Sequence, residues 1–353
     1  MNFLFLFFLL ISLTFSQLKF SFNDSTTGFE ANLLAYPILN YATETRIGYG
    51  AGGRYFYRSI KEREFSTITP VLLYTQNKQL LINIDFDHYY EKSHIYGKVT
   101  YKKFPTSFYG IGNSSSFDKK EKYTPKLLRL NLNYERNIAK NIAVGMGTEI
   151  QSVSFSEFDS LGVLTQNNIV GLTDNFISGL NFLATYDSRD HKFNSYSGHF
   201  TRLQYQLFDS SLGSDTNFSK FLMDVRFFKK VGKLVFAHQI MYETSTNSTP
   251  FMLLPRLGGG KSLRGMSVGR YIDKNLFYSQ LESRYRVLKK YSITGFVGFG
   301  QVWNKSFSDN KLHPVYGIGG RMHYPGKERL TFRADLAFSK DGNQIYLEIN
   351  EAF

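Results

Sequence analysis

Apolar and polar residues alternate along most of this chain. In residues 127–136, Leu128 and Leu130 fall on one side of the pattern, and Arg129 and Asn131 fall on the other. A period of two is that of a β-strand, whose successive side chains point to opposite faces of a sheet. The alternation therefore predicts strands. A soluble sandwich would bury its apolar face in the same way, so a single segment does not separate the two classes.

The number and length of the alternating segments do separate these classes. Sixteen segments show the pattern, most of them 11 to 15 residues long: 28–38, 45–58, 65–76, 79–90, 93–104, 123–136, 140–153, 173–187, 197–209, 217–229, 233–245, 273–287, 291–303, 312–324, 328–339 and 343–353. Strands in soluble domains run about 5–6 residues, whereas a tilted membrane strand needs about 9–11. Short turns alternate on the whole with longer polar loops such as 105–122, 154–172 and 246–272. We predict an all-β fold, a sixteen-stranded antiparallel transmembrane β-barrel of the outer-membrane type. A large soluble β-protein is the alternative.

The two ends of such a barrel are expected to meet. In hydrocarbon every backbone donor and acceptor must pair, so an open sheet edge is not viable there. We therefore expect the last segment, which ends at Phe353, to pair with the first one near residues 29–36. Because Phe353 shares the alternation phase of Ile345 and Leu347, we also expect its side chain to face lipid.

Residues 1–16 form an apolar run that ends in small polar residues. The run is shorter than the about 20 residues of a transmembrane helix and suits a secretory signal peptide that is cut after Ser16. No Lys or Arg precedes the apolar stretch, and a retained anchor is the alternative. We expect the barrel to occupy residues 17–353 and to lie in the bacterial outer membrane.

Composition and charge narrow the range of partners. The chain has 24 Tyr and 34 Phe, no Cys and a formal net charge of +13. Aromatic residues suit strands, and the lack of cysteine excludes disulfides. Lys and Arg are spread along the chain and concentrate in turns, where they suit solvent or anionic lipid head groups. We expect outer-membrane lipid as a partner and no nucleic acid.

Two glycine motifs match patterns found in enzymes but lack the context that the chemistry needs. Residues 48–53 match the dinucleotide fingerprint, yet the alternation continues as strand where that motif requires a helix. Residues 265–269 match the nucleophile elbow of serine hydrolases around Ser267, again with no helix after it. No group of His, Asp and Glu has metal-ligand spacing. We predict no enzymatic activity, no cofactor and no metal site.

A loop rich in glycine and arginine, residues 254–271, lies between two predicted strands. Its segment Leu263–Met266, LRGM, resembles the Val-Arg-Gly-aromatic motif of the bacterial surface antigen family of outer-membrane barrels. Residues 186–199, YDSRDHKFNSYSGH, resemble that family's Asp-x-Arg-Asp…Pro-x-x-Gly turn, with Ser in place of proline. The residues of this periplasmic turn motif are Asp187, Arg189, Asp190 and Gly198. The match covers nearly the whole mature chain.

The resemblance implies a structural role for the loop. In the family this loop folds back into the lumen, and its arginine contacts an acid on the barrel wall. Loop 246–272 is then inward-folded, with Arg264 and Gly265 at its tip and Glu282 as the acid. The family's second acid stands in a Phe-x-Asp-x-Gly pattern where this chain has a glycine, so we expect Asp335 as a possible secondary partner. The loop is expected to gain little from hydrophobic burial, which leaves the ion pair to hold it.

The resemblance also implies a class of function. The family includes the insertases of the Bam and Tam assembly machineries and the two-partner secretion transporters. A role in protein or lipid insertion or transport at the outer membrane follows, with client outer-membrane proteins or a periplasmic accessory protein as partners and Phe353 as an assembly signal. Family insertases carry periplasmic POTRA domains, and this chain is expected to lack them. The alternative is a passive channel, or a structural barrel that serves as a platform for a periplasmic or surface partner. The oligomeric state is not predicted.

Overall fold

The computed structural model describes residues 18–353 except 25–28, 43–45, 60–63, 117–119, 156–161, 163, 165–168, 308–310 and 325–328. The predicted signal peptide, residues 1–16, lies outside the described residues. Most of the regular structure in the described part is β-strand. None of the helices in that part is both long enough and apolar enough to cross a membrane.

One large antiparallel sheet accounts for most of the strands. Its members are β1 (Leu18–Asp24), β2 (Phe29–Ala42), β3 (Arg46–Ser59), β4 (Ser66–Thr75), β5 (Leu80–Tyr90), β6 (Ser93–Lys103), β9 (Pro125–Ala139), β10 (Ile142–Phe155), β11 (Asn175–Asp187), β12 (Gly198–Phe208), β13 (Phe218–Val231), β14 (Leu234–Ser245), β17 (Asn275–Leu288), β18 (Tyr291–Trp303), β19 (His313–His323), β20 (Thr331–Ser339) and β21 (Gly342–Ile349). Two small sheets lie in the connections, β7 (Thr106–Phe108) with β8 (Glu121–Tyr123), and β15 (Arg256–Leu257) with β16 (Tyr271–Ile272). The short 3-10 helices are η2 (Ser210–Leu212) and η3 (Phe251–Leu253).

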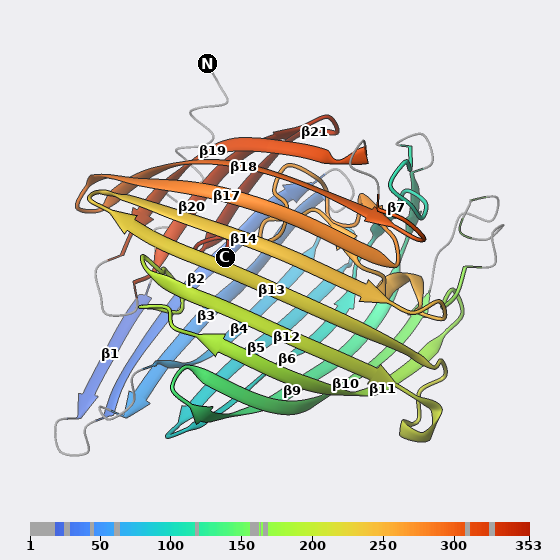
Figure 1. Cartoon of the computed structure of the whole chain (residues 1–353), viewed down its shortest axis with the longest axis horizontal. Coiled ribbons are helices and arrows are strands. Elements are labelled where there is room, and N and C mark those ends of the chain that lie inside the picture. The colour runs from blue at the N-terminus through green and yellow to red at the C-terminus, as the bar shows by residue number, and fades with distance from the viewer. Residues whose placement is uncertain are drawn as a thin grey trace.

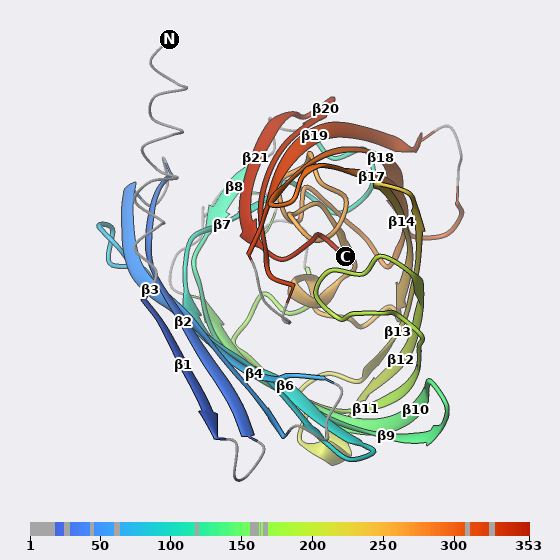
Figure 2. The ribbon, with the colours of Figure 1, turned by 90° about the vertical axis from the view of Figure 1, so that its left-hand side faces the viewer.

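The large sheet is an up-and-down meander. Each strand of this sheet pairs with the next strand of the sheet along the chain, from β1 to β21. The strands lie side by side at a common tilt (Figure 1) and curve around a lumen when seen from the end (Figure 2). Hairpin connections suffice for this order because all neighbours are antiparallel. The predicted all-β, antiparallel fold class is confirmed, and each of the sixteen predicted segments corresponds to a strand from β2 to β21.

The two ends of the sheet differ from the prediction. β1 is an additional strand, and it pairs with β2 from Leu18 opposite Ala35 to Asp24 opposite Phe29. The expected pairing of the last strand with residues 29–36 is therefore wrong, because a strand has only two edges and β1 and β3 occupy them there. Among the described residues β21 pairs with β20 alone. β1 and β21 are the two end strands of the described sheet, and we call the unpaired region between β21 and the β1–β2 pair the seam (Figure 2).

Burial along the strands is inverted relative to that of a soluble protein. On the outer side Met146, Leu281 and Tyr285 are 61%, 45% and 43% exposed. On the lumen side Gln280 and Glu282 are 2% and 0% exposed. An apolar surface of this kind is unfavourable in water and suits hydrocarbon. The alternation in the sequence thus places apolar side chains outward and polar side chains in the lumen.

The two rims of the barrel carry different connections. At one rim the turns are tight, such as residues 232–233 between β13 and β14 and residues 289–290 between β17 and β18. At the other rim the connections are longer, such as residues 156–174 and 246–274. We call these rims the short-turn end and the long-loop end. In outer-membrane barrels short turns lie on the periplasmic side.

Candidate functional site

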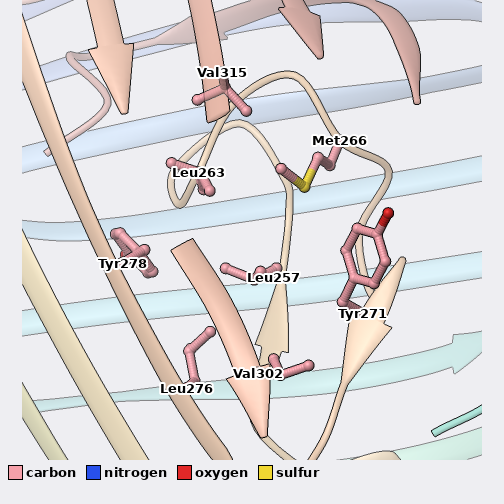
Figure 3. Packing of buried hydrophobic residues seen from close by; sticks show 8 residues of the cluster. All are labelled: Leu257, Leu263, Met266, Tyr271, Leu276, Tyr278, Val302 and Val315. Atoms are coloured by element: carbon pink, nitrogen blue, oxygen red, sulfur yellow. The ribbon is translucent and has the colours of Figure 1, made fainter. Parts of the chain in front are cut away.

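The connection between β14 and β17 enters the lumen and packs against its wall. Its buried residues meet apolar side chains of β17, β18 and β19 in one cluster (Figure 3). The cluster consists of Leu257, Leu263, Met266, Tyr271, Leu276, Tyr278, Val302 and Val315. Burying one Leu or Met side chain contributes about 1.5–3 kcal/mol. The expectation that this loop gains little from hydrophobic burial is therefore wrong.

Leu263 explains how the loop fits without the family's second acid. A Cβ atom built on Gly298 of β18 would lie 2.8 Å from Leu263 Cδ1. The space that an aspartate side chain would take at this position is thus filled by the loop leucine. Met266, which stands where the family has an aromatic residue, is 1% exposed and belongs to the same cluster. The side chain of the loop residue Leu263 therefore occupies the space that Gly298 leaves open in the wall.

Arg264 lies at the tip of the loop and is fully buried in the lumen. Its Nη2 donates to Glu282 of β17 at 2.5 Å, and its Nη1 donates to Asp335 of β20 at 2.7 Å. Its guanidinium carbon lies 3.7 Å from the ring centre of Phe296 on β18, within the range of a cation–π contact. One side chain thus joins the loop to three strands, and the structure brings together Arg264, Glu282 and Asp335.

Gly265 lets the loop backbone approach the wall. Its φ is +115°, a conformation that other residues rarely adopt, and a Cβ there would lie 3.0 Å from the carbonyl oxygen of Phe338. Its N–H donates to Tyr346 Oη of β21 at 3.1 Å, and its carbonyl accepts from the Ser339 hydroxyl at 2.7 Å. The tip is therefore fixed by backbone contacts as well as by the arginine.

A larger charge network surrounds this pair and was missed by sequence reasoning. It contains four guanidiniums and four carboxylates, which belong to Arg264, Arg284, Arg321, Arg333, Glu282, Asp335, Glu348 and Glu351. Equal numbers of opposite charges leave the network without a net charge, so its members other than Glu348, whose side chain is 30% exposed, can be buried together. A sequence signal exists for part of it, because Glu282-x-Arg284 and Arg333-x-Asp335 place both charges of each pair on one face of a strand.

Arg321 of β19 is the centre of this network. Its Nε donates to Glu351 at 2.7 Å, its Nη1 donates to Asp335 at 2.5 Å, and its Nη2 lies 3.5 Å from Glu282. Each acid that Arg264 contacts therefore has a second arginine partner. Glu282 also accepts from Arg284 Nε at 2.6 Å.

The turn motif shapes the short-turn end through local contacts. Arg189 donates to both carboxylate oxygens of Asp187, at 2.9 and 2.7 Å. Gly198 has a φ of +105°, and a Cβ there would lie 2.4 Å from the carbonyl oxygen of Ser188. Glycine is thus required for the chain to close the turn and start β12.

Asp190 ties the same turn to the far side of the barrel. Its carboxylate accepts from Arg329 at 2.6 Å and from the backbone amides of Tyr196 and Ser197 at 2.8 and 3.0 Å. Burial alone would raise the pKa of Asp190, but these hydrogen bonds and the Arg329 charge outweigh it and lower the pKa. Lys192 of the same turn donates to Asp87 of β5 at 2.6 Å. The turn therefore spans the short-turn end from β5 to the β19–β20 connection.

Phe353 does not face outward, so the expectation that it faces lipid is wrong. β21 ends at Ile349, and Asn350 has a φ of +73°, which turns the chain out of the ladder. Glu351 then reaches Arg321 in the lumen, and Phe353 packs with Phe228 and Ala237 on the inner wall. The C-terminus accordingly lies inside the ring of strands (Figure 2).

The dinucleotide-like motif of residues 48–53 and the elbow-like motif around Ser267 both lack the following helix that these motifs require. β3 continues as a strand through residues 48–53, and Ser267 lies in a turn of the lumen loop with no helix after it. In the part of the chain that the structure describes, no group of three His, Asp or Glu residues is placed to hold a metal ion.

Solved structures share this fold at low sequence identity. The chain aligns over 96% of its length with 74% of BamA from Haemophilus ducreyi lacking POTRA domains 1-3, at 13% identity and a TM-score of 0.57. It aligns over 95% of its length with 65% of CdiB from Acinetobacter baumannii, at 11% identity and a TM-score of 0.60. For CdiB from Escherichia coli the shares are 94% and 61%, at 10% identity and a TM-score of 0.53. The chain thus spans somewhat under two thirds of each CdiB chain.

Sequence comparison assigns the family. A search of curated proteins finds no match to this chain. The model of the Omp85 superfamily domain matches residues 61–346, a range that holds the turn motif, the lumen loop and both acids that Arg264 contacts. The resemblance drawn from the loop and turn motifs is confirmed, and this chain belongs to the Omp85 superfamily.

Proposed function

We propose that this chain is an integral barrel of the bacterial outer membrane that inserts or translocates another polypeptide, or a lipid, at that membrane. Membership of the Omp85 superfamily supports the class of function. The exposed apolar belt around a polar lumen supports the location, because this arrangement is stable only in hydrocarbon. The predicted signal peptide, residues 1–16, would direct the chain out of the cytoplasm.

The seam is the observation that carries this proposal. β21 has one edge with no backbone partner among the described residues, and the edge of β2 is covered along residues 29–35 by the short strand β1. An unpaired strand edge is a template for another strand. Seven paired residues are also few to displace compared with the fourteen-residue ladder that joins β2 to β3. The seam would therefore admit a strand of a client polypeptide.

In this proposal the lumen loop braces one side of the seam. Arg264, Gly265 and Glu282 form the lock, and Asp335 is the second acid. Their contacts join the loop to β17, β20 and, through the Tyr346 hydroxyl, to β21. The loop would thus move together with the last strands when the seam opens, and it would keep the β21 edge in a fixed shape.

Two further predictions belong to the same proposal. The turn formed by Asp187, Arg189, Asp190 and Gly198 would close the periplasmic end, as its contacts with β5 and Arg329 suggest. Phe353 would still serve as an assembly signal while the barrel forms, before its side chain is packed in the lumen. Client outer-membrane proteins or a periplasmic accessory protein would be the partners.

Depletion of the protein, followed by proteomics of the outer membrane, tests the function. Broad loss of other barrel proteins is the expected result. Loss of this protein alone would instead favour the alternative, a passive channel or a platform for a periplasmic or surface partner.

A cysteine pair tests the seam directly, because the chain has no cysteine of its own. Ser21→Cys with Asn32→Cys joins register partners of β1 and β2. Ala334→Cys with Leu347→Cys is the matched control, since it joins register partners of β20 and β21 and leaves β1 free. Under oxidising conditions the first pair should fail to rescue the depleted cells, and reduction should restore rescue. Equal rescue by both oxidised pairs would rule out use of the β2 edge.

A further inference from the structure

A cavity of about 270 Å³ opens at the short-turn end, next to the C-terminal segment. Its lining is strongly basic. The basic residues are Lys230, Lys233, Arg284, Arg286, Lys289 and Arg321. Glu351 is the acid among the lining residues. Arg284, Arg321 and Glu351 belong to the charge network described above, and Lys230, Lys233, Arg286 and Lys289 add four positive groups beside it.

The ion pairs of the network do not neutralise this cavity. Arg321 pairs with Glu351 and Asp335, and Arg284 pairs with Glu282. Lys230, Lys233 and Lys289 line the cavity and have no ion pair in the described part of the chain. Lys230 instead lies with its Nζ 5.5 Å from the ring centre of Tyr196. The cavity therefore holds a surplus of positive charge near the barrel rim.

Arg284 lies in the wall of this cavity and has one donor without a hydrogen-bond partner. Its Nε donates to Glu282, and its Nη2 donates to a main-chain carboxylate oxygen of Phe353, the last residue of the sequence, at 3.4 Å. Its Nη1 is buried and has no hydrogen-bond partner among the described residues. Leaving a buried donor unpaired is unfavourable, and a charged one more so. Because Arg284 lines the cavity, a small rotation of its guanidinium would bring this shielded donor to an oxygen atom of a bound anion.

The neighbouring groups are held in place before any ligand arrives. Arg286 donates to the Tyr196 hydroxyl at 2.6 Å and to the carbonyl oxygen of Lys289 at 2.9 Å. Arg284 and Arg286 are two residues apart on β17, so both point to the lumen side while Tyr285 between them points outward. Arginines fixed in this way lose little entropy when they bind an anion.

We infer that this cavity is a binding site for a phosphate group. A phosphate group offers several acceptor oxygens and a negative charge of about one in a lipid diester and about two in free phosphate, which match forked guanidinium donors and clustered lysines. The group belongs either to a soluble phosphate or to the head group of an anionic lipid, since the exposed lysines stand at the rim where inner-leaflet head groups lie. This site goes beyond the proposed function and does not depend on the seam.

The test uses the full chain in detergent micelles at constant ionic strength near 0.15 M. Calorimetry measures binding of inorganic phosphate, of dihexanoylphosphatidylglycerol and, as a zwitterionic reference, of dihexanoylphosphatidylcholine. Binding of inorganic phosphate without binding of the phosphatidylglycerol identifies a soluble ligand. Tighter binding of the phosphatidylglycerol, with displacement of phosphate, identifies a lipid head group. Either result supports the site, whereas binding of neither overturns it.

Paired lysine variants separate the cavity from general attraction to a basic protein. Lys230→Gln with Lys289→Gln removes two lining charges that are exposed and not part of the buried network. Lys229→Gln with Lys290→Gln is the control, because these exposed lysines adjoin the first two in sequence and do not line the cavity. The first pair should weaken binding about thirtyfold and the control pair less than about twofold. Equal weakening by both pairs, or tighter binding of a hexaglutamate peptide than of either phosphate ligand, would contradict a phosphate site.

Discussion

Replacement of Arg264 by alanine is the most informative perturbation of the lumen loop. The guanidinium is 0% exposed and bridges Glu282 and Asp335. Its removal leaves three arginines facing four carboxylates, one negative charge in excess. Breaking a buried pair in this way costs about 3–5 kcal/mol. The lower end applies here, because each acid keeps Arg321 as a second partner.

The loop should loosen at its tip and remain in the lumen. Leu257, Leu263 and Met266 keep their apolar contacts in the variant, and each contributes about 1.5–3 kcal/mol. We expect a loss of about 3 kcal/mol in the free energy of local opening, or on the order of a hundredfold in the protection of tip amides. Hydrogen exchange with mass spectrometry over residues 258–268 measures this. Val268→Ala is the control, because Val268 is 64% exposed in the same loop.

A charge-restoring double variant makes the test sharper. Glu282→Gln in the Arg264→Ala background leaves three arginines and three carboxylates. The double variant should therefore be less loosened than the sum of the two single variants, with a coupling energy of about 1–3 kcal/mol. Unchanged protection in Arg264→Ala, or simple addition of the two effects, would refute the reasoning that the ion pair holds the tip.

Three further outcomes follow from the structure. Gly265→Ala should destabilise the tip by about 1–3 kcal/mol in the same exchange assay, because φ is +115° there; Gly295→Ala, whose Cβ would meet no atom within 4 Å, is the control and should have little effect. Asp190 has a lowered pKa, so its contribution to stability is present near neutral pH and is lost as pH falls through that pKa. The melting temperature of Asp190→Asn should therefore depend less on pH below about 5 than that of the wild type, and equal slopes would count against the pair with Arg329. Deletion of Phe353 removes its packing on Phe228 and should cost about 3–5 kcal/mol in purified protein; normal yield in the outer membrane would argue against its role as an assembly signal.

The sequence by itself determined the class of fold and the inward face of the key acid. A period of two specifies which side of a strand each residue takes, so Glu282 could be assigned to the lumen once Leu281 and Tyr285 were assigned outward. Strand number and length followed from the same pattern, because strands that cross a membrane must be long. The glycine and arginine of the loop tip were visible for a similar reason, since few residues tolerate a positive φ beside a wall.

Only the tertiary structure decided which groups meet across the lumen. Alternation places Arg321, Asp335 and Glu282 inward but carries no information about the distance between β17, β19 and β20 side chains in a curved sheet. The apolar packing of the loop was equally hidden, because Leu263 fits only where β18 has Gly298. These contacts depend on the shapes of the loop and of the barrel wall together, whereas the pattern in one stretch of sequence describes only one of the two.

The two ends of the sheet show most clearly where local alternation stops determining the structure and tertiary contacts begin to do so. Phe353 continues the alternation of β21, yet the strand stops at Ile349 and the positive φ of Asn350 sends the last residues inward. Glu351 gains a buried arginine partner there, which no local pattern announces. At the other end β1 pairs with the edge of β2 that was expected to pair with the last strand in a closed barrel. Which of two strands occupies an edge is a competition between distant segments, and it is settled only when the whole sheet has formed.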